Sequence, residues 1–168
     1  VNCKEFEDAE KNVENFIKKI MHNKSGKSVD YYHRKLGKIM WDKCGMSRNA
    51  TDLKSAITEI RNLRVEFYAN VYVPGDANCY NEELAKAGRV ADFLELGELF
   101  AKDALERNES CGGHFREEYQ TEEGEALRND DDFTFVSCWE HKGEDENPKL
   151  NKEKLKFESV ELKSRSYK

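Results

Sequence analysis

Cysteine and histidine form two pairs of identical spacing in the second half of the chain. Cys111 and His114 make one C-x-x-H pair, and Cys138 and His141 make the other. Four side chains of these types could bind a zinc ion tetrahedrally. However, C-x-x-H is not a standard zinc spacing, and nothing in the sequence brings the two pairs together. We therefore expect no metal site and keep a small zinc protein as an alternative.

The first of these pairs also contains a candidate nucleophile and base. Cys111 could attack a substrate with help from His114, while the amides of Gly112 and Gly113 stabilise an oxyanion. Nucleophile and base usually come from separate parts of a chain, so two hydrogen-bonding side chains are the better interpretation. The run Asp130–Asp132 lacks the spaced ligands of a calcium loop. The two glycine-rich motifs that bind nucleotide phosphates, G-x-G-x-x-G and G-x-x-x-x-G-K-[ST], do not occur. The sequence predicts no catalytic, cofactor-binding or metal-binding residue.

Four segments carry apolar residues at the three- and four-residue steps of a helix. The first spans residues 6–20, and the other three follow the N-cap residues Ser28, Asn49 and Asn81. We expect the fourth helix to continue to about Ser110, which makes it the longest element of the chain.

The fourth helix is apolar on more than one face, so we expect neighbours on two of its sides. Leu94 should lie deep in the core, whereas Phe93, Leu96 and Phe100 form a second stripe that we expect to be exposed in this chain alone. Three long helices with short connections predict a mainly α fold. The expected arrangement is an antiparallel, up-down-up, three-helix bundle like a spectrin repeat, with the first helix docked against it.

The last third of the chain has a different pattern. Residues 133–139 and 155–162 are rich in aromatic, β-branched or alternating apolar residues and predict two strands. A polar turn at residues 143–148 separates them. We expect residues 1–113 to form the helical bundle, and residues 114–168 to form an extended segment whose β-hairpin and tail pack on it.

Charge and composition exclude several classes of protein. The net charge is −6, and residues 101–148 hold fifteen acidic and only five basic side chains, so nucleic acid is not an expected partner. No apolar run is long enough to span a membrane, and we expect no direct membrane insertion. Five scattered cysteines argue for a reducing cytoplasm. Because the chain lacks an initiator Met, we expect it to be a piece of a longer protein.

Several strings along the chain are shared with one known family. They are His33–Trp41, Gly45–Asn49, Arg89–Glu98, Arg107–Glu117 and Arg165–Lys168. Together they resemble the C-terminal region of the flavoprotein subunit of succinate dehydrogenase and fumarate reductase. The resemblance covers essentially the whole chain, and its most specific part runs from Glu109 and Ser110 to His114 and Arg116.

One difference from many members points to a branch of that family. Where they carry Arg-Gly-Ala after the Glu-Ser, this chain has Cys111, Gly112 and Gly113. The variant resembles the bacterial branch that works with menaquinone. A thiol cannot supply the bidentate charge of an arginine, so no role of that arginine is transferred to Cys111.

The resemblance implies a parent enzyme that interconverts succinate and fumarate. In that family, electrons pass through a covalently bound FAD to an iron–sulfur subunit and quinone. The flavin and substrate motifs of the family belong to upstream domains, so this piece is expected to be a non-catalytic helical scaffold. Its implied partners are the flavin-binding and capping domains of the same chain and the iron–sulfur subunit. The parent complex implies a peripheral place at the cytoplasmic, inner face of the cell membrane.

Five residues near the end of the fourth helix are candidate contacts to those domains. Charged side chains that cluster at a helix terminus usually need partners, so we expect them to be interdomain anchors. The alternative is that they cap the long helix internally and contact nothing else. The expected anchors are Arg107, Glu109, Ser110, His114 and Arg116.

A different class of function also fits the helical pattern. The chain could be a free-standing helical protein-interaction module. Aspartate oxidase and adenylylsulfate reductase share the general C-terminal helical plan. The segments at Trp41 and at residues 165–168 nevertheless resemble the succinate/fumarate group more specifically.

Overall fold

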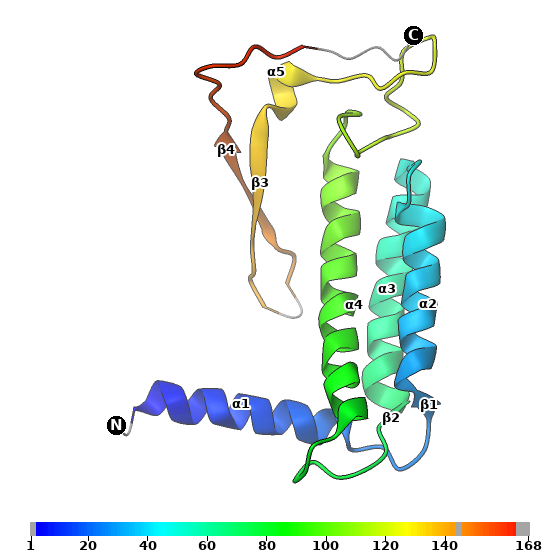
Figure 1. The fold of residues 1–168 in the computed structure, drawn as a ribbon, viewed down its shortest axis with the longest axis vertical. Helices are drawn as coiled ribbons and strands as arrows, with labels where there is room; N and C mark the ends of the chain where they lie inside the picture. The colour runs from blue at the N-terminus through cyan, green and yellow to red at the C-terminus, as the bar shows by residue number, and fades with distance from the viewer. Residues whose placement is uncertain (1–2, 144–145, 164–168) are drawn as a thin grey trace.

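The computed structural model describes residues 3–143 and 146–163. Three long helices stand side by side, namely α2 (Val29–Cys44), α3 (Ala50–Asn70) and α4 (Glu82–Glu106), and the chain reverses direction between them (Figure 1). The short strands β1 (Lys27–Ser28) and β2 (Val71–Tyr72) pair in parallel where α2 begins and α3 ends. The prediction of a mainly α fold is confirmed.

The remaining elements lie around this bundle. Helix α1 (Lys4–Ile20) projects sideways from its base (Figure 1). After the short helix α5 (Asp130–Phe133), a hairpin of β3 (Phe135–Glu140) and β4 (Lys149–Lys154) stands beside α4. The two strands are antiparallel.

The three bundle helices begin at the residues that the sequence indicates. The Ser28 hydroxyl accepts a hydrogen bond from the Tyr31 amide, and the Asn49 side chain accepts one from the Asp52 amide. Asn81 does the same for α4. Each cap satisfies an amide that has no partner within its helix, which confirms the three predicted N-termini.

The core lies between α2, α3 and α4. Each helix contributes at least one fully buried side chain to it. These are Tyr32 from α2, Ile60 and Phe67 from α3, and Leu94 from α4. Gly97 faces α2, where a Cβ atom would lie 3.3 Å from the Met40 sulfur. The missing side chain therefore allows α4 to pack closely on α2.

A buried carboxylate also ties α3 to α4. Glu98 is 5% exposed, and one of its oxygens lies 2.7 Å from Arg61 Nε and 2.8 Å from Lys102 Nζ. Its other oxygen lies 2.9 Å from Arg64 Nη1. Burial alone would raise the pKa of Glu98, but the bonds from Lys102 and Arg61 outweigh it and lower the pKa. The carboxylate therefore stays charged inside the bundle.

The predicted docking of α1 against the bundle holds for its C-terminal end. Ile20 is buried and Phe16 packs against the core, whereas Phe6 is 70% exposed. Asn23 binds the Val71 carbonyl, which holds the chain after α1 at the base. α4 was expected to reach Ser110, but it ends at Glu106.

The second strand also lies elsewhere in the sequence than predicted. The prediction placed it at residues 155–162, whereas the observed strand β4 covers Lys149–Lys154. In the observed register Phe135 lies opposite Lys154. The Leu155 amide donates to the Thr134 carbonyl, just before β3 begins. The residues before Thr134 belong to the helix α5, so they offer no extended backbone with which residues 156–162 could pair. The alternating pattern identified a strand-like segment but not its partner.

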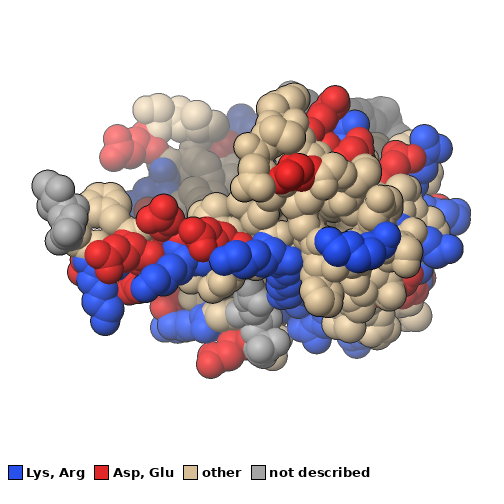
Figure 2. Space-filling view, turned by 90° about the horizontal axis from the view of Figure 1, so that it is seen from below, with Lys and Arg blue, Asp and Glu red and all other residues tan. Residues whose placement is uncertain are grey.

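Acidic and basic side chains are mixed at the base of the molecule. Figure 2, which views the bundle from below, shows Lys and Arg beside Asp and Glu along the projecting α1. Within the described residues, no helix is both long and apolar enough to cross a membrane.

The burial of Leu94 leads to a stability prediction. We expect Leu94→Ala to lower the free energy of unfolding by about 2–5 kcal/mol, because the substitution loses transfer energy and leaves a cavity. Leu96→Ala on the same helix is the matched control, since Leu96 is 60% exposed, and it should cost less than about 1 kcal/mol. Urea titration measures both changes. Equal losses in the two variants would contradict the core described above.

Candidate functional site

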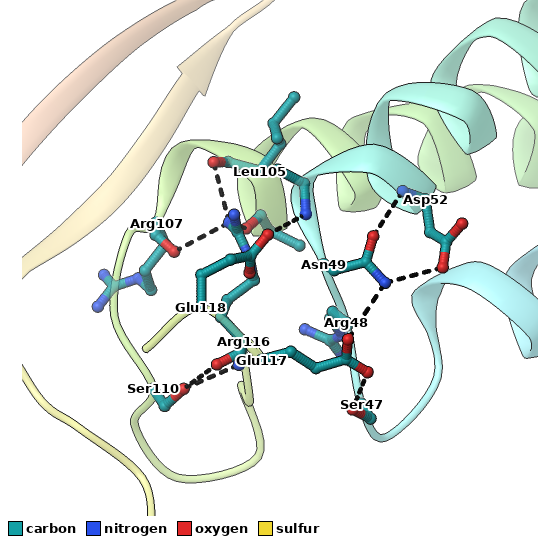
Figure 3. A network of polar contacts seen from close by, with 12 residues as sticks. Ser47, Arg48, Asn49, Asp52, Leu105, Arg107, Ser110, Arg116, Glu117 and Glu118 are labelled. Carbon is teal, nitrogen blue, oxygen red and sulfur yellow. Dashed lines mark hydrogen bonds and ion pairs between the residues drawn. The ribbon is translucent and has the colours of Figure 1, made fainter. Parts of the chain in front are cut away.

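The five expected anchor residues gather in the loop that follows α4. This loop folds back on itself through reciprocal backbone hydrogen bonds between Cys111 and His114. It then pairs with the connection between α2 and α3, where the Arg48 amide donates to the Phe115 carbonyl. Figure 3 shows the resulting network, in which the ends of α2, α3 and α4 meet.

Arg116 enters the end of α4. Its side chain is 2% exposed, and Nη1 donates to the carbonyls of Ala104 at 2.9 Å and Leu105 at 3.1 Å. These carbonyls would accept from the amides of residues 108 and 109 if α4 continued. The guanidinium therefore takes the place of the next helical turn, which explains why α4 ends before Ser110. A cation at this position also complements the negative end of the helix dipole.

The same arginine links α4 to α3. Arg116 Nε donates to one oxygen of Glu118 at 3.1 Å, and the other oxygen of Glu118 accepts from the Ala50 amide at the start of α3. Burial tends to raise the pKa of Glu118, but the Ala50 amide and Arg116 lower it on balance. A cation at the C-terminus of one helix is thus joined to an anion at the N-terminus of the next.

Arg107, Glu109 and Ser110 hold the loop and the start of the hairpin. Arg107 donates to Glu109 at 2.6 Å and, through Nη2, to the Phe135 carbonyl at 3.0 Å. The second oxygen of Glu109 accepts from the Asn129 amide. The Ser110 hydroxyl accepts from the Arg116 amide at 2.8 Å. These bonds orient the chain on both sides of the buried arginine.

His114 lies between two helix ends in its neutral form. Its Nε2 lies 3.0 Å from the Arg107 carbonyl, which requires a proton on Nε2, and its Nδ1 lies 2.9 Å from Arg48 Nη1, which requires a free lone pair. Burial lowers the pKa of His114, and the positive charges of Arg48, Arg116 and Arg107 act in the same direction. Both ring nitrogens are occupied, so the imidazole cannot serve as a general base.

Arg48 belongs to the network and was not among the predicted residues. Its Nε donates to the carbonyls of Gly45 at 2.9 Å and Cys44 at 3.2 Å, which caps the end of α2. Its guanidinium lies over the ring of Phe100, 4.9 Å from the centroid. A basic residue just beyond an expected helix end is the signal that could have found it.

The structure places the candidate nucleophile and metal ligands where neither chemistry is supported. Cys138 is exposed on β3, while Cys111 and His114 lie in the loop after α4. In the described part of the chain, no three His, Cys, Asp or Glu side chains are close enough together to hold a metal ion. What the arrangement can do is join three helix ends through charge and hydrogen bonds.

All five predicted anchors therefore have partners within the described chain, as the internal-capping alternative requires. Whether they also contact other domains stays a prediction. The expected division after residue 113 stays a prediction as well, although Phe115 and Arg116 bind directly to the helical bundle.

Comparison with known proteins identifies the family. Residues 33–167 match the family described as fumarate reductase flavoprotein C-term. The chain belongs to this family. Its members are flavoprotein subunits of fumarate reductase and succinate dehydrogenase, which are oxidoreductases that bind FAD.

Individual relatives agree with this assignment. The fumarate reductase flavoprotein subunit of Helicobacter pylori is 26% identical over 165 residues, which cover 96% of this chain and 22% of the relative. An uncharacterized FAD-dependent oxidoreductase of Methanocaldococcus jannaschii is 32% identical over 112 residues, 67% of this chain and 20% of the relative. The chain thus spans about a fifth of the length of these relatives.

Solved structures show the same fold. A quinol–fumarate reductase with menaquinol molecules matches 95% of this chain and 27% of its own, with a TM-score of 0.78 at 22% identity. Mycobacterium smegmatis Sdh1 in complex with UQ1 matches 90% of this chain and 24% of its own, with a TM-score of 0.72 at 24% identity. These similarities do not separate the branches of the family, so the menaquinone-type branch stays a prediction.

The buried arginine leads to a stability prediction. Arg116→Met should lower the free energy of unfolding by about 3–5 kcal/mol, because it leaves two helix carbonyls and Glu118 without their partner. Arg34→Met is the matched control, since Arg34 forms an exposed pair with Asp30. It should cost less than about 1 kcal/mol. A small loss for Arg116→Met in urea titrations would mean that the cap is dispensable.

The neutral His114 leads to a pH prediction. Because its folded pKa lies below the ordinary value of about 6.5, the unfolded state binds more protons between these two pKa values. The stabilisation by His114 should be complete above about pH 7 and should decrease as pH falls through 6.5. Urea titrations should therefore show His114→Gln losing less stability at pH 5.5 than at pH 7.5. His141→Gln, which removes an exposed imidazole, is the control; equal losses for His114→Gln at both pH values would contradict the neutral form.

Proposed function

We propose that this chain is the C-terminal helical scaffold of a succinate dehydrogenase or fumarate reductase flavoprotein subunit and is itself non-catalytic. The proposal rests on one observation: the side chains of the segment from Glu109 to Arg116, which is the most specific to the family, form hydrogen bonds within the domain. Both ring nitrogens of His114 form hydrogen bonds, and Arg116 donates to carbonyls of α4 and to Glu118. Residues bonded in this way hold helix ends in position.

The parent subunit would supply the chemistry. In this proposal its upstream domains hold FAD, interconvert succinate and fumarate, and exchange electrons with an iron–sulfur subunit and quinone. Support comes from the family match and from the relatives, which carry the names of fumarate reductase flavoproteins and are four to five times as long as the matched segment. A flavin needs a fold that binds its pyrophosphate, and this chain contains no glycine-rich phosphate loop.

The same proposal names the partners and the location of the scaffold. The flavin-binding and capping domains of the parent chain would pack on the bundle, and the iron–sulfur subunit would complete the complex. Arg107, Glu109, Ser110, His114 and Arg116 would anchor that contact indirectly, by holding the end of α4 in shape. The complex would place the domain at the cytoplasmic face of the membrane as a peripheral component.

A free-standing interaction module is the second candidate. The exposure of Phe93, Leu96 and Phe100 on α4, which confirms the predicted exposed stripe, favours it as much as it favours a scaffold. The coding sequence upstream of Val1 separates the two functions. A glycine-rich dinucleotide motif in that sequence would support the scaffold, and an unrelated sequence would support the module.

The proposal leads to a binding prediction. The chain of 168 residues should neither bind FAD nor reduce fumarate when it is produced alone. Flavin fluorescence should remain unquenched as protein is added, and a reduced dye should not be reoxidised by fumarate. Stoichiometric quenching or turnover would show that this segment carries chemistry that we assign to upstream domains.

A further inference from the structure

A hollow of about 250 Å³ opens beside the network, between α4 and the end of α2. Its walls include Arg48, Phe100, Asp103 and Arg107. A separate groove, which Leu96 lines and the hairpin borders, lies elsewhere on α4.

The charges on these walls are unequally paired. Arg107 is neutralised by Glu109 at 2.6 Å, and the Asp103 carboxylate accepts from the Trp139 indole at 2.7 Å. Arg48 has no carboxylate within ion-pair distance among residues 3–143 and 146–163. Its bonds go to the Cys44 and Gly45 carbonyls and to His114. A guanidinium has five N–H groups, so with respect to these described residues Nη2 and one N–H of Nη1 are available as a two-pronged donor.

Aromatic rings border the free guanidinium. Phe100 lies directly beneath it and is 46% exposed, and Phe93, two helical turns away on the same face of α4, is 42% exposed. An arginine over an aromatic ring beside further exposed apolar surface is typical of a protein contact centre.

We propose that this face docks a segment of the upstream domains that presents one carboxylate side chain to Arg48 and apolar side chains to Phe93 and Phe100. The inference rests on the proposed function and adds the contact surface. A carboxylate matches the two-pronged donor. The occupant is assigned to the same polypeptide because the matched relatives extend far beyond this segment, which covers 22% of one and 27% of another.

The test uses the full-length flavoprotein subunit that contains this chain. Arg48→Lys places an amine in the hollow, and a carbodiimide then couples that amine to a carboxylate in direct contact. Mass spectrometry of the digest should show a new cross-link between position 48 and an Asp or Glu upstream of Val1. Arg34→Lys is the matched control, because Arg34 is exposed on α2 and pairs with Asp30. Its cross-links should remain within α2.

A second probe covers the case in which Arg48→Lys impairs folding. A photoreactive benzoylphenylalanine at position 93 should capture the same upstream segment, with at least fivefold higher yield than at Val65, which is 71% exposed on α3. Cross-links from position 48 that stay within residues 1–168, or equal capture from positions 93 and 65, would overturn the inference and leave the proposed function standing. A coding sequence without upstream flavoprotein domains would overturn both.

Discussion

The burial of the Arg116 guanidinium at the C-terminus of α4 is the interaction on which the arrangement of this domain depends. It supplies the donors that the last carbonyls of α4 would otherwise lack, and it ends the helix at Glu106. A buried guanidinium needs nearly all its donors satisfied, because each unpaired one costs free energy. The loop from residue 107 to 118 must therefore follow one path, and that path brings Glu118 to the start of α3.

Two arginines and a neutral histidine make this junction, at which the ends of α2, α3 and α4 meet, electrostatically possible. Arg48 caps α2 and Arg116 caps α4, and both lie where helix dipoles concentrate negative potential. Burial lowers the pKa of His114, and the positive charges of Arg48, Arg116 and Arg107 lower it further. The imidazole is therefore uncharged, accepting from Arg48 and donating to the Arg107 carbonyl. The junction thus combines strong donors with a limited local charge.

The residues of the junction differ in how many hydrogen-bond donors remain available for a further partner. Arg116 and His114 bind the backbone carbonyls at the end of α4. Arg48 retains donors that face an open hollow beside Phe100. The same junction can therefore hold three helices inside the domain and offer a contact outside it. Glu98 contributes separately, by fixing α3 against α4 in the middle of the bundle.

The sequence by itself was sufficient for the helices and their beginnings. Ser28, Asn49 and Asn81 are caps because their side chains bind amides only three residues away, and the apolar spacing that buries Leu94 is equally local. The family segment from Glu109 to Arg116 was also recognisable, although its role as a helix cap was not its predicted first role.

Only the tertiary structure decided the features that depend on a distant partner. α4 ends where a side chain ten residues beyond its last residue replaces its next turn, and β4 lies where β3 provides extended backbone. Similarly, α1 packs on the bundle through Phe16 and Ile20 near its C-terminal end, and Glu98 is buried because three cations converge on it. Periodicity reports which face of an element is apolar, but the partner that covers this face, or completes a charge, is set by contacts between residues far apart in the chain.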